Sequence, residues 1–430
     1  MTAASPARRA QPAPPADAGR AAADCAEAVS PEAVRAETLR AETLRADAVR
    51  ADAVRADAVR ADAGARLAAA VGRADTAASS PAATVRVARP ILLATVILTV
   101  AVVIGVAVGP ADLSPGQVGA ALADHLPWHP HLAVSALASA IVWQLRMPRV
   151  VLGVLVGSML AGGGAAYQGI FRNPLADPYL LGVAAGGGLG ATIVVVSGGS
   201  MALLPPAAFA GAAGAVALTY ALGASGGRSD GGDSVAARSG TGSILLAGIA
   251  VAALLTAFQT YLQQQHSQTL ATVYSWILGG LSAATWSQIL LVLPYIAVSM
   301  IALLAHRRLL DVLRVGETEA ASLGVDVARV RLLVVIAATL GVSAAVAVSG
   351  LIGFVGIIVP HAIRLTAGPS YRVLLPVSMI GGAAFLVLAD VAARTVQAPS
   401  EVPIGVITAV AGAPFFLFVL RSRRARQDLS

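Results

Sequence analysis

Long apolar runs, separated by short polar breaks, dominate this 430-residue chain from about residue 90 onward. Because about 20 apolar residues of helix cross a bilayer core, runs of this length predict membrane spans. Gly or Pro stands at nearly every junction between runs. The segments lie roughly at residues 90–109, 150–168, 180–197, 205–224, 244–262, 288–305, 332–348, 351–366, 373–392 and 404–420. The pattern predicts an all-α, polytopic membrane protein with about ten transmembrane helices.

The segment near 351–366 is short and contains Pro360. We expect the proline to break this span. Interrupted spans are tolerated where the backbone is buried in protein or lines a cavity.

The first 88 residues have a different pattern. Between Pro31 and Arg60 a five-residue unit of the form A[DE]x[VL]R repeats. Five residues advance a helix by about 500°, so the Val and Leu side chains build no apolar face. We expect residues 1–88 to be a solvated, partly helical or disordered extension, with a partner-binding arm as the alternative. The membrane domain is then expected over 89–424, followed by a short tail at 425–430.

Composition agrees with a membrane protein and limits the chemistry. Hydrophobic residues make up 57% of the chain and charged residues 12%, which excludes an ordinary soluble domain. The net charge is +7, but the arginines lie in the N-terminal tail and at the ends of apolar runs, so no nucleic-acid groove is expected. Lysine is absent, so a G-x-x-x-x-G-K-[ST] phosphate loop cannot occur. We therefore expect no ATPase site, no cofactor, no metal site and no enzymatic activity in this chain.

Arginine positions predict the topology. With both termini inside, nearly all loop arginines lie on the cytoplasmic side, as the positive-inside rule requires. The exceptions are Arg146, Arg149 and Arg394, which fall outside. Arg394 has a possible partner in Asp390, one helical turn earlier. Arg146 and Arg149 have no acidic residue nearby in the sequence, and lipid phosphate is one alternative partner.

Three further patterns have both a structural and a functional interpretation. Small residues recur every four positions at Gly153, Gly157 and Ala161, which favours close helix packing or leaves room for a passing solute. Thr241 and Ser243 precede a span, where they either line a narrow inner gate or cap a helix. The segment GETEAASLGV (316–325) predicts a short helix that ends at Gly324.

Several longer motifs occur in a fixed order. They are RMPR (146–149), GSMLAGGG (157–164), YQGIFRNPLADPYLLGV (167–183), GETEAASLGV (316–325), GLIGFVGIIVPHAIR (350–364) and LADVAARTVQAPSEVPIGVITAVAGAPFF (388–416). Together they resemble the permease subunit of ABC importers for iron-siderophores, haem and cobalamin. The resemblance extends from about Arg89 to the C-terminus.

The resemblance implies partners and roles. An extracytoplasmic substrate-binding protein is expected to dock through its carboxylates on Arg146, Arg149 and Arg394. A separate ATPase, which binds the ATP, is expected to receive a coupling helix. The coupling residues would be Gly316, Glu317, Glu319, Ala320, Leu323 and Gly324. A second permease copy, identical or a close paralogue, would complete a pathway in the plasma membrane, and the residues expected to line or gate it are Gly153, Gly157, Ala161, Thr241 and Ser243.

The expected function is thus import of a metal chelate, most readily an iron-siderophore, with haem or cobalamin possible. The alternative is an ion-coupled secondary transporter. That class normally keeps an ionisable residue in mid-membrane, and the nearest case here, Asp390, falls close to the outer surface.

Overall fold

The computed structural model describes residue 40 and residues 81–125, 135–225 and 236–427, and in these residues every regular element is helical. The elements are α2 Pro81–Ala107, α3 Pro115–Ala123, α4 Ala136–Ala140, η1 Ile141–Arg146, α5 Met147–Ile170, η2 Pro178–Leu181, α6 Val183–Val196, η3 Met201–Leu203, α7 Leu204–Ser225, α8 Ala236–Gln265, η4 Ser267–Thr269, α9 Leu270–Ile277, α10 Trp286–Leu313, α11 Glu317–Ser322, α12 Val327–Ser349, α13 Val355–Ala367, α14 Tyr371–Thr395 and α15 Ile404–Gln427. The bundle belongs to one compact unit, Val85–Ser430. The expectation for the N-terminal repeats falls outside the described residues.

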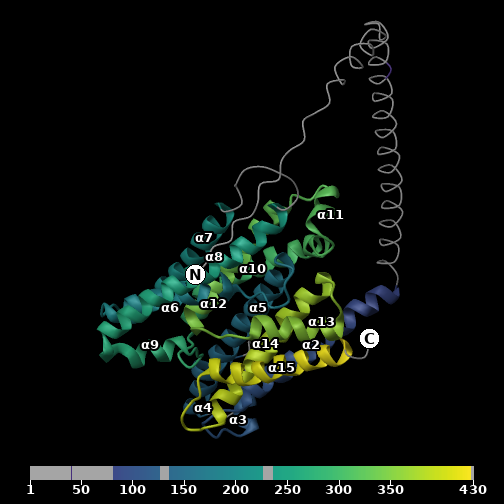
Figure 1. Ribbon diagram of the computed structural model, residues 1–430. Helices are drawn as coiled ribbons and strands as arrows, with labels where there is room; N and C mark the ends of the chain where they lie inside the picture. Colours follow the sequence, from purple (N-terminus) through teal and green to yellow (C-terminus); the bar gives the residue numbers. More distant parts are fainter. Residues whose placement is uncertain (1–39, 41–80, 126–134, 226–235, 428–430) are drawn as a thin grey trace, which may run out of the picture. The chain divides into compact units, whose positions relative to one another are not determined.

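Helix α5 forms the centre of the bundle (Figure 1). It packs against α14, α12, α10 and α13, and all of its residues from Val156 to Ile170 are buried. Helices α4, η1 and α5 follow one another without a break over Ala136–Ile170. The π-helical segment η1 precedes Pro148, which cannot donate a backbone hydrogen bond, and Met147 N–H donates instead to Val142 O. The arginines of RMPR therefore lie within a helix and not in front of one.

The peripheral helices carry their large apolar side chains outward. Leu92 on α2, Leu246 on α8 and Leu290 on α10 are each about two-thirds exposed. Helices α2, α7, α8 and α10 each bury less than a third of their apolar window, whereas α5, α12 and α14 bury most of theirs. An apolar perimeter of this extent is what a lipid-facing surface requires.

Each of the ten apolar segments predicted from the sequence coincides with a helix. Among the described residues, seven helical stretches are long and apolar enough to cross a membrane. The other three segments are shorter apolar helices: Val183–Val196, Val355–Ala367 and Ile404–Phe415. The all-α, polytopic membrane fold is confirmed.

The interruption expected at Pro360 lies elsewhere. Helix α13 runs through Pro360 without a break, and the non-helical backbone is the preceding turn, where Phe354 has φ 69°. A proline inside a helix leaves the carbonyl four residues earlier without its donor. Here that carbonyl belongs to Gly356, and Gln168 Nε2 of α5 donates to it at 3.1 Å. The side chain of a neighbouring helix thus replaces the missing backbone bond.

Candidate functional site: an apolar hollow and two polar ends

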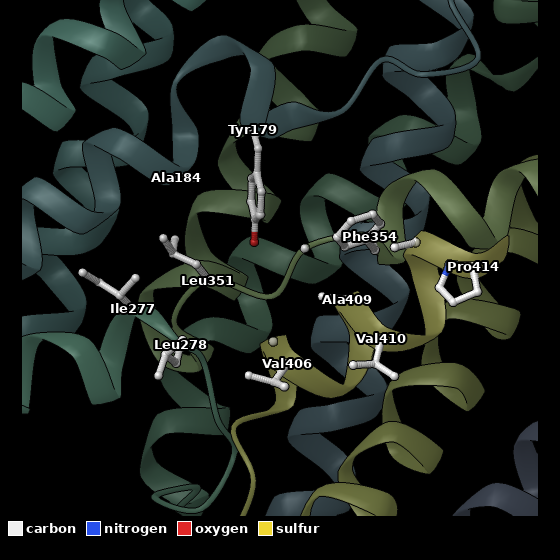
Figure 2. Close-up of a pocket in the computed structure, with 13 residues that line it drawn as sticks. Tyr179, Ala184, Ile277, Leu278, Leu351, Phe354, Val406, Ala409, Val410 and Pro414 are labelled. Carbon is white, nitrogen blue, oxygen red and sulfur yellow. The ribbon is translucent and has the colours of Figure 1, made fainter. Parts of the chain in front are cut away.

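A hollow of about 840 Å3 lies between α15, the end of α9, the start of α6 and the turn before α13. Figure 2 shows its 13 lining residues, among which Tyr179 alone carries a polar side chain. Leu278, Phe354, Val406 and Val410 supply much of the apolar wall. The volume is in the range of sites that hold small organic ligands. Such a wall offers neither hydrogen bonds nor metal ligands to a solute.

Tyr179 is held in the wall by two hydrogen bonds to one residue. Its hydroxyl donates to Ile352 O at 3.0 Å and accepts from Ile352 N–H at 3.0 Å. Its own backbone N–H donates to Asp177 Oδ1 at 2.8 Å, which caps η2. Burial raises the pKa of Asp177 to about 6, against the opposite effect of that hydrogen bond. Because both hydrogen bonds of the Tyr179 hydroxyl are made to Ile352, the hydroxyl is already satisfied and the hollow presents an apolar surface.

A second group of polar residues lies where α5 and α14 meet. Arg149 Nε donates to Asp390 Oδ1 at 2.7 Å, and its two terminal nitrogens donate to the two Glu401 carboxylate oxygens at 2.7 and 3.0 Å. The arginine is 9% exposed and Asp390 is 2% exposed. The bidentate geometry is that of a strong charge-assisted pair.

The two other arginines of this group, Arg146 and Arg394, are also buried and bonded within the chain. Arg146 donates to the carbonyl oxygens of Val106, Ala107 and Ala111, which lie at and just after the end of α2. Arg394 pairs with Asp390 at 3.5 Å and donates to Gly105 O. The expected Asp390–Arg394 pair is confirmed.

We refer to Arg146, Arg149, Asp390, Arg394 and Glu401 as the arginine cluster. Three guanidinium groups and two carboxylates leave it with one net positive charge, and it ties α2 and α14 to the continuous η1–α5 helix. Arg149 thus has acidic partners that are distant in the sequence, and Arg146 has backbone carbonyl partners, so neither arginine depends on lipid phosphate. Docking of a binding protein on these arginines stays a prediction, and at Arg149 and Arg394 it now requires that an existing carboxylate be displaced.

The predicted helix after Gly316 forms as α11, at the end of the bundle opposite α3 and α4 (Figure 1). It ends as expected: Gly324 has φ 80°, and the N–H groups of Gly324 and Val325 donate to Ala321 O and Ala320 O, a Schellman motif. Leu323 is 45% exposed, whereas Ala320 is fully buried.

The other coupling candidates divide in the same way. Gly316 is buried and Glu317 pairs with Arg331 of α12, whereas Glu319 and Gly324 are exposed. Only Glu319, Leu323 and Gly324 therefore present surface to a partner, while Gly316, Glu317 and Ala320 hold α11 in place.

The small-residue stripe of α5 contacts α14 and does not line the hollow. A Cβ atom on Gly157 would lie 2.3 Å from Gly382 O, so these two backbones touch. Gly153 faces Leu281 and Val387, and Ala161 is fully buried. The structure thus supports helix packing for Gly153, Gly157 and Ala161 and does not place them on a pathway.

Thr241 and Ser243 lie inside α8, beyond its first turn, so the capping interpretation is wrong for both. Ser243 Oγ donates to Gly223 O of α7 at 2.9 Å. A gate at these residues stays a prediction.

Two features of the candidate site were not singled out from the sequence. Glu401, which binds Arg149, and the α15 wall of the hollow both fall within the 388–416 motif, and the motif was the only available signal. The Arg149–Glu401 pair could not be predicted from closeness in the sequence, because the two residues are 252 positions apart.

The fold, with its apolar perimeter, apolar hollow and charged ends, defines a polytopic membrane permease. Comparison with known proteins identifies the family of permeases. Residues 97–422 match the FecCD transport family. The chain is 39% identical over 348 residues to the cobalamin import system permease protein BtuC of Halobacterium salinarum, covering 78% of this chain and 91% of that protein. It is 39% identical over 302 residues to the hemin transport system permease protein HmuU of Yersinia pestis, covering 66% and 85%.

Two further comparisons agree. The Fe(3+)-citrate import system permease protein YfmE of Bacillus subtilis is 32% identical over 344 residues, covering 78% of this chain and 96% of that protein. A solved structure described as an inward-facing conformation of a metal-chelate type ABC transporter superposes with a TM-score of 0.67, at 28% identity, over 77% of this chain and 98% of that one. The chain belongs to the FecCD transport family, and it is a multi-pass permease of the plasma membrane.

Proposed function

We propose that the chain is the permease subunit of an ABC importer and that two copies enclose a pathway for a bulky metal chelate. An iron-siderophore is the first candidate cargo, and haem or cobalamin are the others. The observation that carries this proposal is the 840 Å3 hollow with its apolar wall. A chelate already satisfies its metal, so it needs a passage that offers no competing ligands. The names of the relatives, which specify cobalamin, hemin and Fe(3+)-citrate, point to the same cargo class.

Exposed apolar residues in the wall support a second copy. Leu278, Val406 and Val410 are 40%, 39% and 67% exposed in the single chain. A pathway open to lipid along one side would not retain a solute, and a second chain on the same face would close it. The pair is either two identical chains or a chain and a close paralogue.

A separate ATPase would drive the cycle through α11. Leu323 is an exposed apolar side chain at the C-terminal end of the short helix α11, which also carries the exposed Glu319. Apolar anchors of this kind dominate protein interfaces when a partner buries them. The α11 end is then cytoplasmic, together with both termini, and movement of α11 would alternate access to the hollow.

A substrate-binding protein would dock at the opposite, arginine-cluster end by exchanging carboxylates. The Glu401 side chain is 35% exposed, so it is the accessible member of the Arg149 pair. An incoming carboxylate that replaced Glu401 would keep the guanidinium group paired. Glu401→Gln should then tighten binding of the loaded binding protein several-fold, because it removes a competing charge. Unchanged or weaker binding would contradict the exchange.

Uptake into membrane vesicles tests the main proposal. Vesicles holding the permease and its ATPase are given the chelate with ATP and no ion gradient, and separately with a gradient and no ATP. We expect uptake only with ATP. Uptake that needs only the gradient would assign the chain to secondary transporters.

A pair of variants on α15 tests the hollow. Ala409→Trp places an indole in the wall, whereas Leu417→Trp adds the same group on the same helix at a 65% exposed position outside it. Ala409→Trp should abolish uptake while both variants reach the membrane equally. Equal uptake by both would show that the hollow is not the pathway.

A further inference from the structure

A smaller, basic pocket lies at the α11 end of the bundle. Its volume is about 300 Å3, and eight residues line it. Three of them are arginines from three different elements: Arg172 just after α5, Arg314 at the end of α10 and Arg364 in the last turn of α13. No carboxylate is among the lining residues. Neither the proposed pathway nor the coupling helix uses this pocket.

Arg364 is held in position by neutral partners. Its Nη2 donates to Gln168 Oε1 at 3.0 Å and to the Tyr371 hydroxyl at 3.3 Å. Gln168 is itself fixed, because its Nε2 donates to the Gly356 carbonyl that Pro360 leaves without a donor. The guanidinium group is therefore oriented at the pocket while its positive charge stays uncompensated by these contacts.

Arg314 keeps only a weak acidic partner. Its Nη1 donates to Pro369 O at 2.9 Å and lies 3.5 Å from Asp311 Oδ1. Asp311 is mainly engaged elsewhere, because it accepts from Ser370 Oγ at 2.8 Å and from Tyr371 N–H at 2.7 Å. Three arginines and this one carboxylate leave the pocket region with an excess of two positive charges.

Arg172 shows the clearest conflict between local conformation and residue type. Its φ is 47°, a left-handed conformation that Gly or Asn adopts more readily. Its side chain makes no hydrogen bond or ion pair with any described residue, so nothing within this part of the chain explains an arginine there. The alternative explanation is that basic residues favour helix C-termini, which α5, α10 and α13 place here. That alternative predicts no ligand.

We propose that Arg172, Arg314 and Arg364 form a binding site for a phosphate anion, of the kind carried by the headgroup of an anionic phospholipid. Guanidinium groups bind phosphate oxygens through paired N–H donors. The pocket accommodates a headgroup, and basic pockets between membrane helices commonly hold one. Two uncompensated positive charges match a single phosphodiester better than a neutral solute.

Thermal unfolding of the purified full chain tests the site. The midpoint is measured in a neutral detergent against increasing short-chain phosphatidylglycerol, the matching phosphatidylcholine, or inorganic phosphate. We expect phosphatidylglycerol to raise the midpoint saturably and phosphatidylcholine not to do so. A saturable rise with inorganic phosphate alone would equally support the site and would identify free phosphate as the ligand.

Three variants separate this site from general electrostatics. Arg172→Asn removes one charge and suits the left-handed backbone, so it should weaken phosphatidylglycerol affinity about fivefold without affecting folding. The double variant Arg172→Asn/Arg364→Gln should weaken it about 25-fold. Arg329→Gln, at an exposed arginine in the first turn of α12 outside the pocket, should leave it unchanged.

Several outcomes would overturn the site. They are the absence of a shift with both phosphate compounds, Arg172→Asn affinity equal to that of the unmodified chain, or an equal loss in Arg329→Gln. Loss of ATPase subunits from Arg172→Asn with unchanged lipid affinity would also overturn it and would assign the arginines to a protein contact. Counting bound phosphatidylglycerol by native mass spectrometry provides a second readout that is independent of stability.

Discussion

Removal of the Asp390 charge is the most direct test of the arginine cluster. Asp390 pairs with Arg149 at 2.7 Å and with Arg394 at 3.5 Å, and all three side chains are largely buried. Loss of one partner from a buried ion pair typically costs about 3–5 kcal/mol, because the remaining charge stays buried and uncompensated. Here Arg149 keeps Glu401 and Arg394 keeps the Gly105 carbonyl. We therefore expect Asp390→Asn to cost about 3 kcal/mol, at the lower end of this range.

Glu401→Gln is the matched control. Its side chain also pairs with Arg149 but is 35% exposed, so water screens the lost charge and the cost should stay below about 1 kcal/mol. Thermal unfolding followed by size-exclusion chromatography distinguishes the two. At about 2 °C per kcal/mol, Asp390→Asn should lower the midpoint by about 6 °C and Glu401→Gln by at most about 2 °C.

The double variant Asp390→Asn/Arg394→Gln tests the reason for the loss. If the uncompensated Arg394 charge is the cause, the second substitution should recover part of the stability lost by the first, because it removes that charge. Equal destabilisation by Asp390→Asn and Glu401→Gln, or simple additivity in the double variant, would refute the charge argument.

Three further predictions concern packing, coupling and the extension. Gly157→Ala should lower the free energy of unfolding by at least about 3 kcal/mol, because its new methyl group meets the Gly382 carbonyl at 2.3 Å. Gly153→Ala should lower it by less than about 1 kcal/mol, because the nearest atom is a leucine methyl at 3.3 Å. Thermal unfolding compares the two variants. Leu323→Asp should leave folding intact, because the side chain is already 45% exposed, but lose co-purifying ATPase or uncouple its hydrolysis from uptake; a variant that still transports normally would contradict coupling through α11. Deletion of residues 2–80 should leave assembly and uptake close to normal, and failed assembly in size-exclusion chromatography would reveal a functional arm.

Several glycines in this bundle allow the backbones of two helices to come into contact. The contact of Gly157 with Gly382 and that of Gly164 with Gly356, where a Cβ would lie 2.0 Å from the carbonyl oxygen, bring α5 against α14 and α13. Such close approach gives α5 its central position. It also explains why a small-residue stripe on an apolar helix is weak support for a pathway.

The sequence alone determined the features that depend on local chemistry. Apolar runs of sufficient length indicate membrane helices, since a helix bonds nearly all of its backbone polar groups within its own segment, as the bilayer core requires. The end of α11 was equally local, because Gly324 adopts the left-handed conformation that a Schellman motif requires. The longer motifs indicated the permease family, which the match to the FecCD transport family confirms.

Only the tertiary structure decided what each helix face meets. In a membrane protein both the lipid-facing and the protein-facing sides of a helix are apolar, so hydrophobicity does not distinguish the α5 stripe from a pathway wall. Arg149 finds its acidic partners 241 and 252 residues further along the chain, and the phosphate pocket joins the ends of three helices. Such pairings depend on how helices pack, because periodicity shows which residues share a face but not which distant residue lies opposite.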